Sequence, residues 1–259
     1  MDLVSALVLA VVQGIAEWFP VSSSGHMALV GKFLESSADF AFEMALNFGT
    51  LMAVFVYFRR DIVMIFRDII NGHWLTDNSR LGFLLLIASI PAGVFGFIFK
   101  SYFDVLSGNL FILGSGWLVT SVVLFIGSFS KSKNKNAHQL SYSRALIIGA
   151  SQVLAFVPGV SRSGMTMSSG LFFGLKEKQT ILFSYLLSIP VIMGANLVTF
   201  GNGVIPFEFL IPTLVCFVLG LIFMNFSFKY VLNDRKNLRW FGLYTGVLGI
   251  VSLVFGLFY

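Results

Sequence analysis

The sequence has few charged residues and a single cysteine. Only 11% of its 259 residues are Asp, Glu, Lys or Arg, whereas 57% are apolar. This low charge excludes an ordinary soluble domain, in which about a quarter of the residues are charged. Cys216 has no second cysteine to pair with, so an intramolecular disulfide is excluded and a thiolate metal site is not expected. The first residues also lack the basic n-region of a cleaved signal peptide.

Long apolar runs fill most of the remaining sequence. A helix needs about 20 apolar residues to cross the ~30 Å hydrocarbon core of a bilayer. Runs of that length occupy residues 40–58, 81–99, 109–129, 179–200, 209–228 and 240–259. They predict an all-α, multi-pass protein of the cell (plasma) membrane with six full spans. The net charge of +5 calls for no nucleic-acid partner, since basic loops of membrane proteins usually set orientation.

Two polar stretches interrupt the apolar sequence and align with each other. The offset is 139 residues, the separation of Gln13 from Gln152. The residues Ala6-Leu7, Gln13, Ala16, Val21-Ser22, Ser24-Gly25 and Gly31 recur as Ala145-Leu146, Gln152, Ala155, Val160-Ser161, Ser163-Gly164 and Gly170. The copies differ where chemistry is expected: Glu17, Ser23 and His26 align with Phe156, Arg162 and Met165. The alignment predicts two diverged repeats, neither of which is a complete site alone.

Each polar stretch lies between two short apolar segments. These segments are 3–16 and 26–35 in the first repeat, and 144–157 and 165–175 in the second. We expect each pair to form a re-entrant helical hairpin, because irregular backbone at membrane depth is tolerated only inside protein or beside a wet cavity. The prediction is one integral membrane domain of about ten helices, with repeats at about 1–129 and 144–259 and a linker at about 130–143.

Each repeat then contains a hairpin and three spans, and an odd number of spans inverts the second repeat. If the first hairpin opens outward, the cytoplasmic segments hold fourteen of the seventeen Lys and Arg residues, leaving only Lys32, Lys100 and Arg162 elsewhere. The opposite orientation would contradict the positive-inside rule. We therefore expect both termini and the site opening on the outer side. The two hairpin tips should meet near the midplane, as in inverted-repeat transporters.

Arg162 lies at the expected tip of the second hairpin. A charged group at membrane depth costs several kcal/mol, on the order of 3 by insertion scales, so it is a functional candidate. The planar guanidinium suits two-point binding of phosphate oxygens. The alternative is a structural ion pair with Glu17 or Glu43 that holds the hairpins together.

Serine and glycine precede each short second helix. Such helix starts direct backbone N–H groups and the positive end of the helix dipole toward an anion. The alternative is simple helix capping by serine. The candidate phosphate-binding residues are Ser22, Ser24, Gly25, Ser161, Arg162, Ser163 and Gly164.

Glu17 and His26 flank the first serine cluster. The imidazole could act as base, acid or nucleophile, and the carboxylate could bind a divalent metal or orient a nucleophile. Gln13 lies one turn before Glu17 on the same helix face. Glu43 and Asn47 form another i, i+4 polar pair, interpreted as anchors behind the site or as packing residues.

The block from Gln13 to His26, followed by Pro158-Gly-Val-Ser-Arg-Ser-Gly-Met-Thr166, closely resembles the undecaprenyl-diphosphatase family (UppP/BacA). Both blocks occur in order, and the span pattern agrees over essentially the whole chain. The resemblance implies an integral membrane phosphatase that hydrolyses undecaprenyl diphosphate to the monophosphate. It also implies recycling of the lipid carrier for peptidoglycan and cell-wall synthesis, a link to cell shape, and resistance to bacitracin, which sequesters the diphosphate.

The resemblance also implies roles for particular residues. Ser23 and His26 match the family's catalytic serine and histidine, Arg162 its phosphate-binding arginine, and Glu17 the second acid of its E/Q-x-x-x-E motif. Gln13 stands at the first position of that motif, which leaves one carboxylate fewer than in members with two glutamates. The implied cofactor is a divalent cation, Mg²⁺ or Ca²⁺, with Glu17 and Gln13 as its ligands.

Several alternatives stay open from sequence. Either Ser23 or His26 could be the nucleophile, and a homodimer is neither required nor excluded. Ser161-Arg162 is not followed by the His and Asp of the PAP2 acid phosphatases, whose places hold Ser168 and Phe172, so that family is rejected. The competing function is a polyprenyl-phosphate transporter or flippase, because inverted repeats with broken helices are also transporter architecture.

Overall fold

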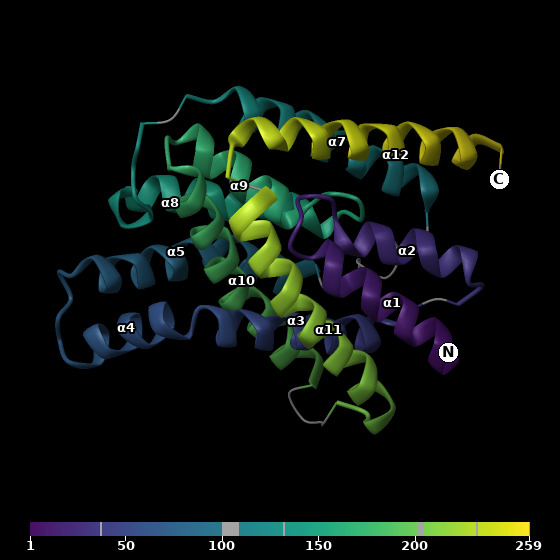
Figure 1. Ribbon diagram of the computed structural model, residues 1–259, viewed down its shortest axis with the longest axis horizontal. Coiled ribbons are helices and arrows are strands. Elements are labelled where there is room, and N and C mark those ends of the chain that lie inside the picture. The colour runs from purple at the N-terminus through teal and green to yellow at the C-terminus, as the bar shows by residue number, and fades with distance from the viewer. Residues whose placement is uncertain (37, 100–108, 132, 201–204, 232, 259) are drawn as a thin grey trace.

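The computed structural model describes residues 1–259 except 37, 100–108, 132, 201–204, 232 and 259 (Figure 1). The part of the chain it describes is α-helical without a named strand, which confirms the predicted all-α class. Its α-helices are α1 (Leu3–Ala16), α2 (Ser23–Phe33), α3 (Phe40–Tyr57), α4 (Arg59–Ile70), α5 (Asp77–Phe99), α7 (Leu110–Phe129), α8 (Tyr142–Ser151), α9 (Arg162–Phe172), α10 (Glu177–Phe200), α11 (Leu210–Phe226) and α12 (Leu238–Phe258).

The six predicted spans are all present. Among the described residues, six helical segments are long and apolar enough to cross a membrane. They are Phe40–Tyr57, Asp77–Phe99, Leu110–Phe129, Glu177–Leu197, Phe207–Lys229 and Arg235–Phe258. The expected end of the last span, Tyr259, lies outside the described residues. The protein is therefore a multi-pass membrane protein.

The two short-helix pairs form hairpins, but their second helices begin earlier than predicted. Helix α2 begins at Ser23 and α9 at Arg162, three residues before the apolar segments that the sequence marks. The cause is capping: the hydroxyl of Ser22 accepts a hydrogen bond from Gly25 N, and that of Ser161 accepts one from Gly164 N. Much of each polar motif is thus the first helical turn rather than an irregular loop.

The elements of the two halves pack in exchanged pairs. The first hairpin helix of one half, α1, packs against α11 of the other half, and α8 packs against α5 in the same manner. Helices α7 and α12 lie side by side along one edge of the molecule, and α3 contacts α10 (Figure 1). Both termini lie at the same end of the molecule. This exchange is the pattern expected of an inverted repeat, while the repeat boundaries at 129 and 144 stay a prediction.

Helix α4 is an element that the sequence reasoning did not separate. It follows α3 within residues 59–80, which were expected to be a cytoplasmic loop, and the chain then returns as α5, which packs beside it (Figure 1). Ile65 and Ile69 pack on Gly82 of α5, where an added Cβ would lie 2.7 Å from the Ile65 side chain. The apolar side chains of Ile65 and Ile69, one turn apart, therefore pack α4 against α5 although α4 is too short to span a membrane.

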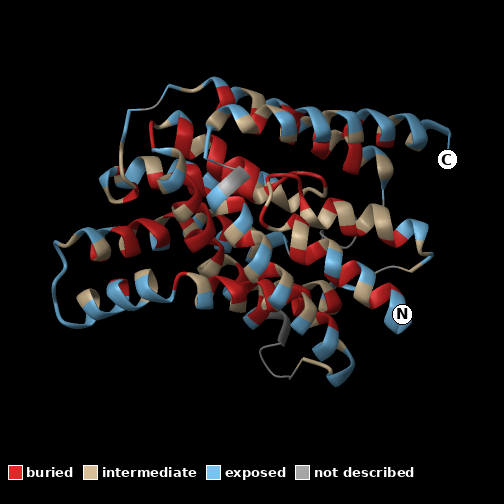
Figure 2. Ribbon diagram, in the orientation of Figure 1, coloured by how far each residue is buried: buried red, intermediate tan, exposed pale blue. Residues whose placement is uncertain are grey.

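Buried residues gather in the centre of the molecule and exposed apolar residues on its outside (Figure 2). The outer faces of α5, α11 and α12 carry many exposed Leu, Ile, Val and Phe side chains, as expected of surfaces that contact lipid. The buried centre also contains many serine and threonine hydroxyls. Several of these hydroxyls, including those of Ser22, Ser161 and Ser163, belong to the two hairpins, where the candidate site is found.

Candidate active site

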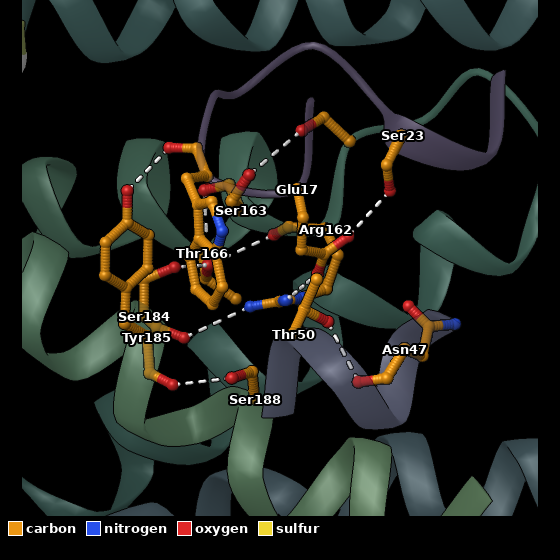
Figure 3. A network of polar contacts seen from close by, with 12 residues as sticks. Glu17, Ser23, Asn47, Thr50, Arg162, Ser163, Thr166, Ser184, Tyr185 and Ser188 are labelled. Carbon is orange, nitrogen blue, oxygen red and sulfur yellow. Dashed lines mark hydrogen bonds and ion pairs between the residues drawn. The ribbon is translucent and has the colours of Figure 1, made fainter. Parts of the chain in front are cut away.

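A mostly buried ion pair joins the two hairpins. Glu17 follows the last residue of α1, and Arg162 is the first residue of α9. The guanidinium Nη2 of Arg162 donates to Oε1 of Glu17, and the two side chains are only 16% and 10% exposed (Figure 3). The structural ion pair considered from the sequence is therefore formed, with Glu17 as the partner. It brings together the acidic residue of one repeat and the basic residue of the other.

Helix α10 orients the guanidinium from the opposite side. Nη1 of Arg162 donates to the carbonyl oxygen of Ser184 at 3.3 Å. The hydroxyls of Ser184 and Thr166 lie 2.6 Å apart, and this contact fixes α9 against α10 (Figure 3). Sequence reasoning missed Ser184 and Thr166 as contributors. Thr166 ends the second motif block, whereas the only sequence signal of Ser184 is a hydroxyl side chain in an apolar run.

The second carboxylate oxygen of Glu17 accepts two further hydrogen bonds. The Ser23 hydroxyl donates to Oε2 at 2.6 Å, and the Gln13 amide nitrogen donates to the same atom at 3.1 Å. That amide nitrogen also donates to Oδ1 of Asn47 at 2.7 Å. Asn47 therefore lies behind the site, as the sequence suggests. Glu43 is half-buried one turn earlier on α3 and does not line the pocket.

The two capped helix starts border one pocket with a cavity volume of about 60 Å³. Its lining consists of Ala16, Glu17, Phe19, Ser22, Ser23, Ser24, Ala155, Val160, Ser161, Arg162 and Ser163. The hydroxyls of Ser22 and Ser24 lie 3.3 Å apart, as do those of Ser161 and Ser163. Most of the candidate phosphate-binding residues of both repeats therefore line one pocket. Gly25 and Gly164 do not line it, but their N–H groups donate to the capping hydroxyls of Ser22 and Ser161.

Helix α7 holds both hairpin tips. The Trp117 indole N–H donates to the carbonyl of Val21 at 3.0 Å in the first tip. The Thr120 hydroxyl donates to the carbonyl of Gly159 at 2.8 Å and accepts from the backbone N–H of Ser161 at 2.9 Å in the second. Backbone groups at membrane depth need such partners because no bulk water reaches them. Sequence reasoning missed Trp117 and Thr120, which lie in an apolar span.

His26 lies beside the first serine cluster, outside the lining of the pocket. Its ring nitrogens contact Ser22 and Tyr244: Nδ1 lies 2.7 Å from the Ser22 carbonyl oxygen and Nε2 lies 2.8 Å from the Tyr244 hydroxyl. The hydroxyl of Ser23 instead contacts Glu17. The arrangement therefore joins serine to carboxylate directly and keeps the imidazole to one side.

The residues present fit a divalent cation only through one carboxylate. No group of three His, Cys, Asp or Glu side chains that could hold a metal occurs within the described residues. Mg²⁺ is often bound through one or two carboxylates plus substrate phosphate oxygens, so Glu17 suits a cation that arrives with a phosphate. Gln13 directs its amide nitrogen toward Glu17 and Asn47, so its present role is to hold the carboxylate.

The ion pair makes a prediction about stability. Removing one partner leaves an uncompensated buried charge, which typically costs about 3–5 kcal/mol. We expect Arg162→Met and Glu17→Gln each to lower the melting temperature of the detergent-solubilised protein. The double variant should lose less than the sum of the two single losses. Additive losses would contradict the pairing, and the exposed Lys32→Met serves as the control without an effect.

Comparison with known proteins agrees with this site. The family model described as "Bacitracin resistance protein BacA" matches residues 6–251. The chain is 37% identical to an undecaprenyl-diphosphatase of Mycobacterium marinum, covering 95% of this chain and 92% of the relative. It is 34% identical to an undecaprenyl-diphosphatase of Korarchaeum cryptofilum, covering 98% of this chain and 99% of the relative. The chain belongs to the BacA family of bacitracin resistance proteins.

Proposed function

We propose that this protein hydrolyses undecaprenyl diphosphate to the monophosphate and inorganic phosphate at the outer face of the cell membrane. The observation that carries this proposal is the meeting of Glu17, Ser23 and Arg162 with two helix starts at one pocket. The names of its relatives support the substrate. Hydrolysis recycles the lipid carrier for cell-wall synthesis and removes the diphosphate that bacitracin sequesters.

Phosphate binding follows from the charge and the donors at the pocket. Arg162 supplies a fixed positive charge with several N–H donors, and the starts of α2 and α9 add the positive ends of two helix dipoles. Glu17 would hold a divalent cation, Mg²⁺ or Ca²⁺, together with substrate oxygens, and the ion would neutralise charge on the diphosphate. The polyprenyl tail stays in the bilayer, beside the apolar outer faces of the spans.

Ser23 is the nucleophile in this proposal. Its oxygen attacks the terminal phosphorus, its proton passes to Glu17 Oε2, and the bond from phosphorus to the bridging oxygen breaks to release undecaprenyl monophosphate. Water then attacks the phosphoserine and the bond from phosphorus to the Ser23 oxygen breaks, releasing inorganic phosphate. The proton of the attacking water passes through solvent to Nε2 of His26, and Glu17 returns its proton to Ser23. The 2.6 Å hydrogen bond from Ser23 to Glu17 supports this role for the carboxylate. Arg162 stabilises the charge on the transferring group.

Phosphate release from undecaprenyl diphosphate by the purified protein tests the activity. We expect release with Mg²⁺ that stops on chelation. Arg162→Ala, Glu17→Gln and Ser23→Ala should each lower kcat by about 10²-fold or more, the cost of losing one transition-state donor or base. Arg144→Ala and Ser143→Ala remove the same residue types outside the pocket and should stay active. No release by a folded wild type that still binds the lipid would instead favour a transporter or flippase.

The identity of the nucleophile is tested by trapping the covalent intermediate. We quench the reaction in acid and locate the phosphoryl group by mass spectrometry. A phosphoserine survives acid, whereas a phosphohistidine is lost, so the expected adduct is acid-stable and sits on Ser23. It should be absent from Ser23→Ala and present in His26→Gln. An adduct on His26 under neutral quenching, or none under either condition, would contradict the serine mechanism.

The proposed orientation places both termini and the pocket opening outside and most Lys and Arg loops in the cytoplasm. It is tested in intact cells with a membrane-impermeant maleimide, on a Cys216→Ser background that has no other cysteine. Lys32→Cys should react from outside. Leu75→Cys, in a fully exposed loop position, should react only after permeabilisation. The reverse labelling would show the opposite orientation.

A further inference from the structure

Tyr244 contacts the histidine that the family resemblance marks as functional. It lies on α12, the last span, and its hydroxyl is 2.8 Å from Nε2 of His26. The two rings are nearly parallel, with an inclination of 15° and centroids 5.7 Å apart. The residues are separated by 218 positions in the sequence. The last span of one half thus reaches the first hairpin of the other.

The hydrogen bonds of His26 define its tautomer. A backbone carbonyl can only accept, so the 2.7 Å contact between Nδ1 and the Ser22 carbonyl oxygen requires a proton on Nδ1. In the neutral imidazole Nε2 is then the acceptor, and the Tyr244 hydroxyl is its donor. Nε2 is therefore the nitrogen that can take up a proton, and in this structure it accepts a hydrogen bond from the Tyr244 hydroxyl.

Two further features hold the ring in this position. Trp117 of α7 meets the imidazole edge-to-face, with centroids 5.4 Å apart and an inclination of 75°. Ser22 has a φ of +68°, a strained conformation that serine rarely adopts. The equivalent Ser161 of the second repeat has an ordinary φ of −81°. Only the repeat that contains the histidine has the strained backbone to which the imidazole is bonded.

We propose that Tyr244 is a positioning residue for His26: it fixes the Nδ1–H tautomer and the direction of Nε2, so that Nε2 exchanges protons during hydrolysis. This inference rests on the proposed phosphatase function. Tyr244 does not line the pocket, and it acts through the imidazole.

Kinetics of Tyr244→Phe test the effect on catalysis. The change removes the hydroxyl and keeps the ring, so we expect kcat to fall about 3- to 10-fold, the range that one hydrogen bond is worth, with KM unchanged. In a His26→Gln background the same change should have no further effect, because Tyr244 acts through His26. Tyr142→Phe, a similarly exposed tyrosine that contacts Arg80 instead, is the control. An unchanged kcat, or an equal fall in the His26→Gln background, overturns the proposal.

Nitrogen NMR of His26 tests the contact without using activity. The chain has three histidines, so His73→Gln and His138→Gln leave His26 as the only imidazole. With ¹⁵N-labelled histidine, the wild type should show a protonated Nδ1 and a hydrogen-bonded, unprotonated Nε2. Tyr244→Phe should move the Nε2 signal toward that of a free imidazole nitrogen. If the Nε2 signal does not move in Tyr244→Phe, the positioning role is overturned, whether or not the wild type is active. If the signal moves but the wild type releases no phosphate, only the proposed phosphatase function is refuted.

Discussion

The ion pair between Glu17 and Arg162 is the interaction on which the arrangement of the hairpins depends. Each charge would be costly at membrane depth alone, and each comes from a different repeat. A buried pair is seldom more stable than well-packed apolar residues of the same volume. Its presence in the centre of an otherwise apolar bundle therefore indicates a chemical role. A phosphate that enters the pocket can take over Arg162 as partner, which leaves Glu17 for Ser23 or a cation.

The irregular backbone around this pair imposes a second requirement, which the long spans meet. Trp117 and Thr120 of α7 satisfy backbone groups in both hairpin tips. On the other side, the Tyr185 hydroxyl of α10 donates to the carbonyl of Trp18 at 2.5 Å. The tip of the second hairpin also lies directly on α7, since a Cβ on Gly116 would be 2.2 Å from the Pro158 carbonyl oxygen. The spans are thus both the membrane anchor and the hydrogen-bond partners of the site.

The spans and the two motifs could be predicted from sequence because composition and internal repetition are local properties. The approach of Glu17 to Arg162 could also be predicted, because the two hairpin tips of an inverted repeat meet near the midplane. The contacts of Ser184, Thr120 and Tyr244 could not be predicted, since a hydroxyl in an apolar run does not reveal which neighbour it faces. The direction of the His26 ring was also out of reach. It depends on the left-handed backbone of Ser22 and on a tyrosine in the last span.

Divergence of the two repeats explains how a symmetric scaffold produces an asymmetric reaction. Features that both hairpins share, namely a capping serine and a second hydroxyl 3.3 Å away, suit a ligand with two similar phosphates. Features present in one hairpin only, such as Ser23 on one side and Arg162 on the other, distinguish the attacked phosphorus from its neighbour. Identical hairpins would put the same groups on both phosphates and could not favour either. In the proposed mechanism, arginine in place of serine at one of two equivalent positions would therefore give the diphosphate a direction in the pocket.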